Sequence, residues 1–526
     1  MKQIKLLVTL AALLSSLALG AHSLHAEGVL KFGRQVDSQF LDPVLTDHNQ
    51  DIWMLNNLYD TLLVSSKDGS TLEPNLATDW QMSEDGLTVT LTIRPDVKFA
   101  DGSSLQTSDI KWTLDRARNP DNGLWNEFLA SIDNVELVGD DKVVLNLGRG
   151  DPAILAALAS FNSSIMPEKL FMAEAGETDE ERAKAFSRHP VGTGPFLLSE
   201  WRTGSSMLLT RNPHYWAVDS NGTQLPYLDE IRVEVIPDDA TRILKLQAGE
   251  LDLVEHVPFS RVAELQADPG VKMAIFPSTR NYGVVVNNRK SRSDGNPNQM
   301  HDRRVRQAMN YAINKEALLK VVFSGIGNPS SGMVPSSTPH AFPAGNVPYP
   351  YDLARAKALL AEAGYPDGFE ISIDTLAGNA DDEAISATLQ QMWGQVGIKL
   401  DISLVDYATR FARYRQGVFD MRHVKWTNDI NDPGQAISYY AYSPTNDSYH
   451  TGYSNKEVEE LYLATQGETV TSRRHDLFQK LQTLYNEDAP IVFLVETPLA
   501  VAMHSSVEGF VQIPLGNQVF KEARVK

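Results

Sequence analysis

The sequence predicts an α/β protein with at least two domains. The chain has 526 residues, more than a single hydrophobic core usually supports. Its apolar content of 42% and charged content of 22% are ordinary for a globular protein. From residue 353 onward, helix and strand patterns alternate in LARAKALLAEAG, FEISIDTL, DEAISATLQQMWGQVG and IKLDISLV. That order is typical of an α/β unit, so the second domain is expected to have its own sheet.

The first 26 residues have the plan of a secretory signal peptide. Lys2 and Lys5 precede an apolar run from Leu6 to about Gly20, and a polar stretch then ends at Ala26. The run is shorter than the ~20 residues that cross a bilayer. We therefore expect cleavage after Ala26, with Gly20 as the second choice, and export to the periplasm. No later stretch is long and apolar enough for a membrane helix.

The first 120 residues predict alternating short strands and helices. A buried strand is expected in VLKFGRQVD, and a helix over 52–63, where apolar residues recur at helical spacing. Apolar residues alternate with threonines over 87–93, which is typical of a half-buried antiparallel strand. TSDIKWTLDRAR begins with residues that cap helices, and it predicts a helix from about residue 107.

The middle of the chain predicts further strands and a long helix. IRVEVIP, over 231–237, alternates as a strand, and the following segment predicts an amphipathic helix that stops at Gly249. Two strand-like runs within 271–288 are separated by a Pro-Ser-Thr turn. After a polar loop, one long helix is expected to reach about residue 322. Its inward-facing side chains are predicted to be Val305, Ala308, Met309, Ala312 and Ile313.

Residues 325–352 are dense in glycine, proline and serine. Such a stretch is either a linker or a long ordered loop, and a loop of this length inside a compact domain is often functional.

Charge and cysteine content exclude several classes of function. The 67 acidic and 47 basic residues give a formal net charge of −20. This charge argues against nucleic acid and anionic membranes as partners, because their phosphates require lysine and arginine. The sequence has no cysteine, which excludes disulfides, thiolate chemistry and a lipid-modified cysteine.

The sequence contains no recognisable catalytic motif that pairs a nucleophile with a general base. The sequence lacks a G-x-S-x-G elbow and an H-E-x-x-H zinc motif, and its twelve histidines are scattered. His189 precedes VGTGPF, which lacks the third glycine and the flanking strand and helix of a phosphate-binding loop. A tight turn is expected there, with His189 packed or solvated. We therefore predict no catalytic residue, no metal site and no cofactor.

The stretch KWTNDINDPG, 425–434, places Asp429 and Asp432 three residues apart. The residues alone are compatible with a capped turn at Asp432-Pro433, with a Ca²⁺ site, or with the paired carboxylates of a hydrolase. The stretch lacks the glycine and the distal glutamate of an EF-hand loop, and two acids on one turn rarely lie on opposite sides of a bond. The capped turn is the favoured interpretation of the residues alone.

Five blocks of the sequence occur in an order that a known family shares. They are GLTVTLTIRPDVKFADGSSLQTSDIKWTL, PEKLF, HPVGTGPFLLSEWRTGSSMLLTRNPHYW, HDRRVRQAMNYAINKEALL and YDLARAKALLAEAGYPDG. With these blocks the chain resembles the extracytoplasmic solute-binding proteins of family 5, the peptide and nickel class of ABC importers. The resemblance runs from about residue 29 to the C-terminus.

The resemblance implies a two-lobed periplasmic-binding-protein fold, type II and cluster C-like, with an extra subdomain in the first lobe. The first lobe is expected to comprise 27–280 plus 490–526, with the subdomain near 70–190. The second lobe is expected over 288–486, with hinge segments near 278–288 and 486–492.

The resemblance also implies ligand-binding residues. In peptide-binding members, an aspartate in a W-x-x-D-x-x-(D/E)-P motif binds the α-ammonium of the ligand, and Trp426, Asp429 and Asp432-Pro433 match that motif. Asp429 is thus the expected ligand residue, with Trp426 stacking on the ligand and Asp432 shaping the loop. Tyr282 on the crossing strand and Arg34 beside the first strand are further candidates to line the cleft.

The resemblance leaves the identity of the ligand open. Arg410, Arg413 and Arg415 are either carboxylate-binding or solvated, and Tyr439 either stacks on a sugar or packs in the core. A small peptide is the main expectation, with an oligosaccharide or an opine as the alternative. The implied partners are ABC permease and ATPase subunits, and the protein is expected to be a monomer without nucleic acid or stable membrane insertion. A hydrolase or a ligand-sensing receptor partner are the alternatives of other classes.

Overall fold

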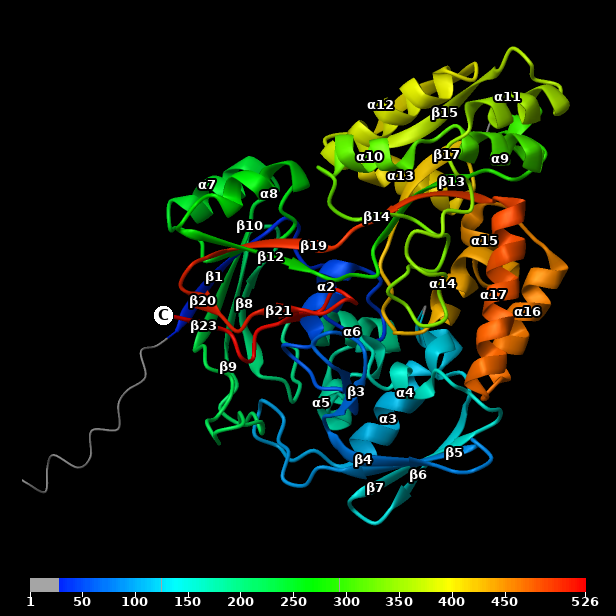
Figure 1. Ribbon diagram of the computed structural model, residues 1–526. Coiled ribbons are helices and arrows are strands. Elements are labelled where there is room, and N and C mark those ends of the chain that lie inside the picture. Colours follow the sequence, from blue (N-terminus) through cyan, green and yellow to red (C-terminus); the bar gives the residue numbers. More distant parts are fainter. Residues whose placement is uncertain (1–27, 124, 293) are drawn as a thin grey trace, which may run out of the picture.

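Two large sheets and one smaller sheet organise the chain (Figure 1). The computed structural model describes residues 28–123, 125–292 and 294–526, so the predicted signal peptide lies outside the described residues. We use "first lobe" for the seven-stranded sheet with the four-stranded sheet beside it, and "second lobe" for the six-stranded sheet with its helices.

The seven-stranded sheet has the order β12-β19-β11-β1-β10-β9-β8. Leu30 and Phe32 in β1 are fully buried, and this strand lies parallel to β10 and β11, as expected of a buried strand. The strands are β1 (Val29–Arg34), β8 (Phe196–Arg202), β9 (Ser206–Arg211), β10 (Glu230–Val235), β11 (Leu253–Val254), β12 (Val271–Phe276) and β19 (Leu499–His504). The nearby helices are α2 (Asn49–Leu55), α7 (Asp239–Gln247) and α8 (Phe259–Gln266).

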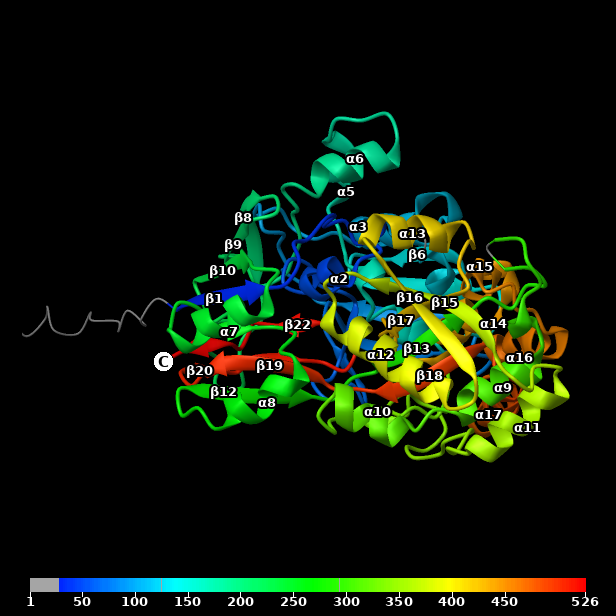
Figure 2. The ribbon, with the colours of Figure 1, turned by 90° about the horizontal axis from the view of Figure 1, so that it is seen from above.

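The four-stranded antiparallel sheet, at the bottom of Figure 1, has the order β4-β5-β7-β6. In β5, the side chains of Val89, Leu91 and Ile93 are buried and alternate with threonines, which confirms the predicted half-buried strand. The strands are β4 (Ala77–Met82), β5 (Thr88–Ile93), β6 (Ile132–Val138) and β7 (Lys142–Leu147). The helices are α3 (Thr107–Ala117), α4 (Ile154–Ala157), α5 (Glu168–Ala173) and α6 (Asp179–Phe186), of which α5 and α6 project in Figure 2.

The six-stranded sheet has the order β14-β18-β13-β17-β15-β16. The predicted α/β unit is confirmed, since β15 and β16 are parallel over eight residues with α12 between them. The strands are β13 (Asn281–Val286), β14 (Asn328–Pro329), β15 (Phe369–Leu376), β16 (Ile398–Val405), β17 (Met421–Trp426) and β18 (Ile491–Glu496). The helices are α9 (Arg303–Tyr311), α10 (Lys315–Val322), α11 (Leu353–Glu362), α12 (Ala380–Gly394), α13 (Tyr407–Arg415), α14 (Pro433–Ala441), α15 (Ser443–His450), α16 (Lys456–Gly467) and α17 (Thr471–Asp488).

Two predicted helices differ from the structure at their ends. The long helix expected up to residue 322 is two helices, because the Asn314 side chain accepts a hydrogen bond from the Ala317 amide and begins α10 as its N-cap. The five side chains predicted to face inward are all fully buried. The helix expected over 52–63 ends at Leu55, and the buried Tyr59 and Leu62 follow outside it.

The glycines of VGTGPF have a packing role. A Cβ atom at Gly192 or Gly194 would overlap the backbone of Leu58, so the chain can only pass at this distance without side chains. His189 is exposed and its Nε2 lies 2.8 Å from Glu174. Both observations agree with the predicted turn.

The strand pairing shows where the chain passes between the two large sheets. β18 (Ile491–Glu496) lies within 490–526, the range predicted for the first lobe, and it pairs with β13 inside the six-stranded sheet. The chain passes between the two large sheets at 277–280, from β12 to β13, and at 497–498, from β18 to β19. Ladder pairing places β13 and β18 in the second lobe. The predicted hinge at 278–288 therefore overlaps the first crossing at 278–280, whereas the one predicted at 486–492 ends before the second crossing.

Candidate ligand-binding site

A cavity of about 370 Å³ lies between the two lobes, at the carboxyl ends of β15, β16 and β17. This edge is where ligands of open α/β sheets bind. The first lobe forms one side with residues 47–50, around the start of α2, and with Trp125. The second lobe contributes Asn379, Asp382, Tyr407, Arg410, Phe411, Tyr414, residues 422–427, Asp429 and Tyr449.

Asp429 is buried in the wall of this cavity and is only 8% exposed. Its Oδ2 accepts a 2.6 Å hydrogen bond from Gln435 Nε2, whereas Oδ1 has no hydrogen-bond partner. Burial raises the pKa of Asp429 to about 7, and the Gln435 bond opposes that rise. A carboxylate buried in this way is stabilised by a cation that satisfies its free oxygen.

The loop that carries Asp429 is anchored to distant segments. The Asn428 amide donates to Thr279 Oγ1 at 2.9 Å, and Thr279 lies in the first crossing between the lobes. The Asn428 side chain donates to Thr338 Oγ1 at 3.1 Å. Gln435 Oε1 accepts from the Asp429 amide at 2.7 Å. Thr338 belongs to the segment 325–352, so this segment supports the loop from outside the cavity.

Asp432 organises the start of α14. One carboxylate oxygen accepts from the Gly434 amide at 2.8 Å, which caps the helix. The two oxygens also accept from Arg474 of α17, at 2.6 Å from Nη1 and 3.0 Å from Nη2. Asp432 is therefore fully engaged within the protein, in agreement with its predicted role in shaping the loop.

Trp426 lines the cavity and Tyr439 packs behind it. The Trp426 indole donates to Asn428 Oδ1 at 2.7 Å, and its ring lies 5.3 Å from that of Tyr439. Tyr439 also lies 5.9 Å from the ring of Trp125 in the first lobe. Trp426 is thus in place to contact a ligand, whereas Tyr439 lies outside the lining and links the two lobes.

Tyr282 and Arg34 do not line the cavity. Tyr282 is buried, and its hydroxyl donates to Asp381 at 3.2 Å. Arg34 is fully buried, where it donates to the Gln50 carbonyl at 2.6 Å and lies 3.6 Å from Glu255. Tyr282 lies on β13, which is paired with β17 and β18 inside the six-stranded sheet. The hydrogen bond to the Gln50 carbonyl holds Arg34 beside α2.

The three arginines of α13 have different surroundings. Arg410 lines the cavity and forms a 2.9 Å ion pair with Asp382. Arg413 is paired with Asp374 at 2.7 Å. Arg415 is exposed and lies 5.3 Å from the Phe411 ring. Of the three, the structure brings only Arg410 to the cavity.

Several cavity residues were not predicted from the sequence. Arg422 and Lys425 of β17 and Tyr449 of α15 line the second lobe, and Trp125 faces them from the first lobe. The sequence pattern could have indicated Arg422 and Lys425, because both are charged residues within a strand whose other residues are typical of a buried strand. No sequence pattern indicated Tyr449 or Trp125, since only the tertiary fold brings them to this cavity.

Three hydrogen bonds join the lobes beside the cavity. Ser438 Oγ donates to Glu127 Oε2 at 2.9 Å, Asn431 Nδ2 donates to the Gly69 carbonyl at 2.8 Å, and Arg149 donates to the Gln466 carbonyl at 2.9 Å. Burial raises the pKa of Glu127 to about 7. The lobes are therefore in direct contact through these hydrogen bonds.

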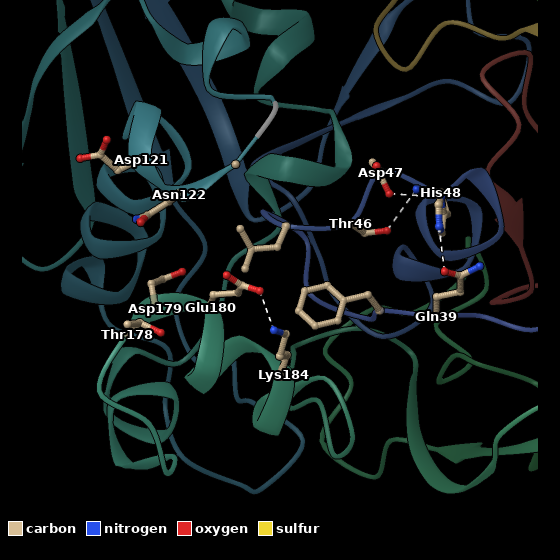
Figure 3. Close-up of a pocket in the computed structure, with 13 residues that line it drawn as sticks. Gln39, Thr46, Asp47, His48, Asp121, Asn122, Thr178, Asp179, Glu180 and Lys184 are labelled. Carbon is tan, nitrogen blue, oxygen red and sulfur yellow. Dashed lines mark hydrogen bonds and ion pairs between the residues drawn. The ribbon is translucent and has the colours of Figure 1, made fainter. Parts of the chain in front are cut away.

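A larger groove of about 660 Å³ adjoins the cavity and shares Asp47 and His48 with it (Figure 3). All its lining residues come from the first lobe. Two of its acids are already paired, Glu180 with Lys184 at 2.5 Å and Asp179 with Arg116 at 2.8 Å. A solute held there would touch one lobe only, so we place the ligand in the interlobe cavity.

Across residues 28–123, 125–292 and 294–526, no helix has the length and apolar character needed to cross a bilayer. Within the same residues, no three histidine, aspartate or glutamate side chains converge as they would around a metal ion.

Comparison with known proteins places the chain in a family. The model of the bacterial extracellular solute-binding proteins, family 5 (middle), matches residues 71–448. The glutathione-binding protein GsiB of Salmonella typhi is 30% identical over 498 residues, which cover 92% of each chain.

Solved structures share the fold along nearly the whole chain. The periplasmic binding protein DppA of Helicobacter pylori, in complex with the peptide STSA, has a TM-score of 0.82 at 24% identity and covers 95% of this chain and 98% of its own. AgaA of A. tumefaciens R10, in complex with agropinic acid, has a TM-score of 0.79 at 24% identity, with 95% and 99% covered. The chain therefore belongs to family 5 of the bacterial extracellular solute-binding proteins.

Proposed function

We propose that this protein is the substrate-binding component of an ABC importer and that it captures a small peptide between its lobes. One observation carries the choice of a peptide. Asp429 is a buried carboxylate in the interlobe cavity, and one of its oxygens has no partner. The terminal ammonium of a peptide supplies the charge and the N–H donors that this oxygen lacks. Trp426 would contact the same end of the ligand.

The proposed mechanism is a shift between open and closed lobes. A ligand in the cavity touches both lobes only when they are closed, so it favours the closed state by its difference in affinity for the two states. The closed protein would then dock on the permease subunits, while separate ATPase subunits hydrolyse ATP. We propose a periplasmic monomer, exported by residues 1–26 without a lipid anchor, that catalyses no reaction.

An opine or sugar is the second candidate, and the aromatic residues at the mouth of the cavity favour it. Tyr407 and Phe411 of α13 are 53% and 38% exposed, and their rings stack at 6.1 Å. Exposed rings beside a polar cavity suit the apolar face of a sugar ring.

The Asp429 proposal is tested with di-, tri- and tetraalanine and with their N-acetylated forms, measured by calorimetry. We expect acetylation, or the change Asp429→Asn, to weaken binding about 10- to 100-fold, because a hydrogen bond to a charged group contributes about 1.5–3 kcal/mol. The exposed Asp476 gives the control Asp476→Asn, which should bind as the unaltered protein does.

Native mass spectrometry of gently purified protein tests the ligand class without a chosen probe. A co-purified solute with a primary amine supports the proposal. A co-purified neutral sugar, together with no binding of any alanine peptide, would reject a peptide as the ligand and favour the second candidate.

A further inference from the structure

We propose that Arg422 is a second ligand anchor, which binds an anionic group of the solute, so that the protein selects ligands carrying an ammonium and a carboxylate together. The proposal rests on the proposed function, because it concerns the same cavity. It assigns a specificity-determining role to a residue on β17, whose carboxyl end leads into the Asp429 loop.

The Arg422 guanidinium is buried without a counter-charge. The residue is 7% exposed and lines the cavity. Its Nη1 donates to the His423 carbonyl at 3.1 Å, while Nε and Nη2 are buried without any hydrogen-bond partner. Among the described residues it forms no ion pair. An arginine stays charged when buried, so an unpaired one is costly to the free protein.

The carboxylates near this part of the sheet are already paired with other arginines. Asp382 is paired with Arg410, Asp374 with Arg413, and Asp420 with Arg292 at 2.8 Å. Arg422 thus has no ion-pair partner among the described residues, and an anionic group of the solute can supply the counter-charge.

The two free donors form one edge of the guanidinium. Nε and Nη2 point side by side in the plane of the group, which is the geometry that binds both oxygens of a carboxylate. Arg116 of the same protein uses this edge to bind Asp179, with Nε 2.9 Å from Oδ1 and Nη2 2.8 Å from Oδ2. In Arg422 the corresponding edge has no hydrogen-bond partner in the protein, and the residue lines the cavity.

Two aromatic rings fix the plane of this guanidinium. Its Cζ lies 3.8 Å from the centre of the Tyr414 ring and 4.8 Å from that of Tyr449. Contact with aromatic rings at these distances favours a fixed orientation of an arginine.

Tyr449 lies in a strained, left-handed stretch at the C-terminal end of α15. Residues 447–450 are four successive non-glycine residues with φ of 46°, 48°, 63° and 58°. This left-handed conformation is unfavourable for L-residues and is found mostly where function requires it. Here it sets Tyr449 over Arg422 and against Trp426, 6.2 Å between ring centres.

Arg422 and Asp429 thus have complementary unmade interactions in one cavity. Arg422 lacks an acceptor with negative charge, and Asp429 lacks a donor with positive charge. A zwitterionic solute supplies a partner to both residues at once. A neutral sugar, an amine without an acid, or a peptide amide supplies a charged partner to at most one of them.

The test compares trialanine, trialanine amide and N-acetyltrialanine by calorimetry, on the unaltered protein and on Arg422→Gln and Arg422→Lys. We expect amidation to weaken binding about 10- to 100-fold in the unaltered protein and to have little effect in Arg422→Gln. Arg422→Lys, which keeps the charge but loses the paired donors, should fall between them. Arg202→Gln, an exposed arginine on β8, is the matched control.

The outcomes separate this inference from the proposed function. Loss of affinity on acetylation reports on Asp429 alone. If acetylation weakens binding while amidation does not, or if amidation weakens Arg422→Gln as much as the unaltered protein, the Arg422 anchor is overturned and the peptide proposal stands.

A measurement without peptide covers the case in which no alanine peptide binds. Sodium succinate, titrated against sodium chloride at equal ionic strength, should raise the thermal midpoint of the unaltered protein and not that of Arg422→Gln. Ligand-free Arg422→Gln should unfold at an equal or higher temperature, because it removes an unpaired buried charge. A lower midpoint for Arg422→Gln, or equal stabilisation of both proteins by succinate, would instead mean that Arg422 only packs against Tyr414 and Tyr449.

Discussion

At the scale of a single residue, the proposed role of Asp429 implies a dependence of binding on pH. Its burial raises its pKa to about 7, so near neutral pH the free protein holds it partly protonated. A ligand ammonium stabilises the ionised form and lowers the pKa again, so binding below pH 7 must release the proton.

This linkage predicts that peptide affinity falls with acidity below pH 7, by up to about tenfold per pH unit. Protonation of Glu127 in the same pH range is expected to change the affinity in the opposite direction. The measurement is therefore made on the Glu127→Gln variant, in which this group does not titrate. Calorimetry from pH 5.5 to 8, in buffers of different ionisation enthalpy, should show proton release at the acidic end. An affinity that stays constant across this range would contradict the assigned role of Asp429.

At the scale of elements, the buried pair Arg474–Asp432 joins α17 to the start of α14. Both side chains are almost fully buried, at 5% and 7% exposure, and Arg474 Nε also donates to the Thr465 carbonyl at the end of α16. One arginine thus holds three helices around the loop that presents Asp429.

We expect Arg474→Met to lower the free energy of unfolding by about 3–5 kcal/mol, because it leaves the Asp432 charge buried without its partner. Urea unfolding measures the change. The neighbouring Arg473 forms an exposed pair with Glu468, so Arg473→Gln should cost less than about 1 kcal/mol. Equal effects of the two substitutions would show that the buried pair contributes no more than the exposed one.

At the scale of the whole molecule, Glu127 links protonation to the arrangement of the lobes. It comes from the first lobe and accepts from Ser438 of α14 in the second, and its Oε1 is buried without a partner. Arg149, Asp151 and Asp432 line the same small cavity. Separation of the lobes would hydrate Glu127 and return its pKa from about 7 toward its ordinary value of 4.5.

Between about pH 4.5 and 7, the closed arrangement therefore binds more protons at Glu127 than the open one, and acid favours closure. We expect the ligand-free protein to be more compact at pH 5.5 than at pH 8, by small-angle scattering. Glu127→Gln mimics the protonated form and should be compact at both values. The exposed Glu136 on β6 provides the control Glu136→Gln, which should keep the pH dependence. Identical profiles for Glu127→Gln and the control would reject Glu127 as the titrating group.

The sequence by itself determined the fold class, most strands and helices, and the segment that carries Asp429. These features depend on local periodicity, as in the alternation of β5 and the α/β unit around α12, or on short motifs such as the one from Trp426 to Pro433. Local patterns of this kind are legible without the tertiary fold.

Only the tertiary structure decided where the chain passes between the two large sheets and which side chains line the cavity. Tyr282 and Arg34 were expected in the cleft, yet ladder pairing and the Gln50 contact bury both elsewhere. Arg422 contacts Tyr414 and Tyr449, which meet it only after folding. Whether a charged side chain is paired or left free depends on distances between residues far apart in the chain, and this is the information that a sequence pattern does not contain.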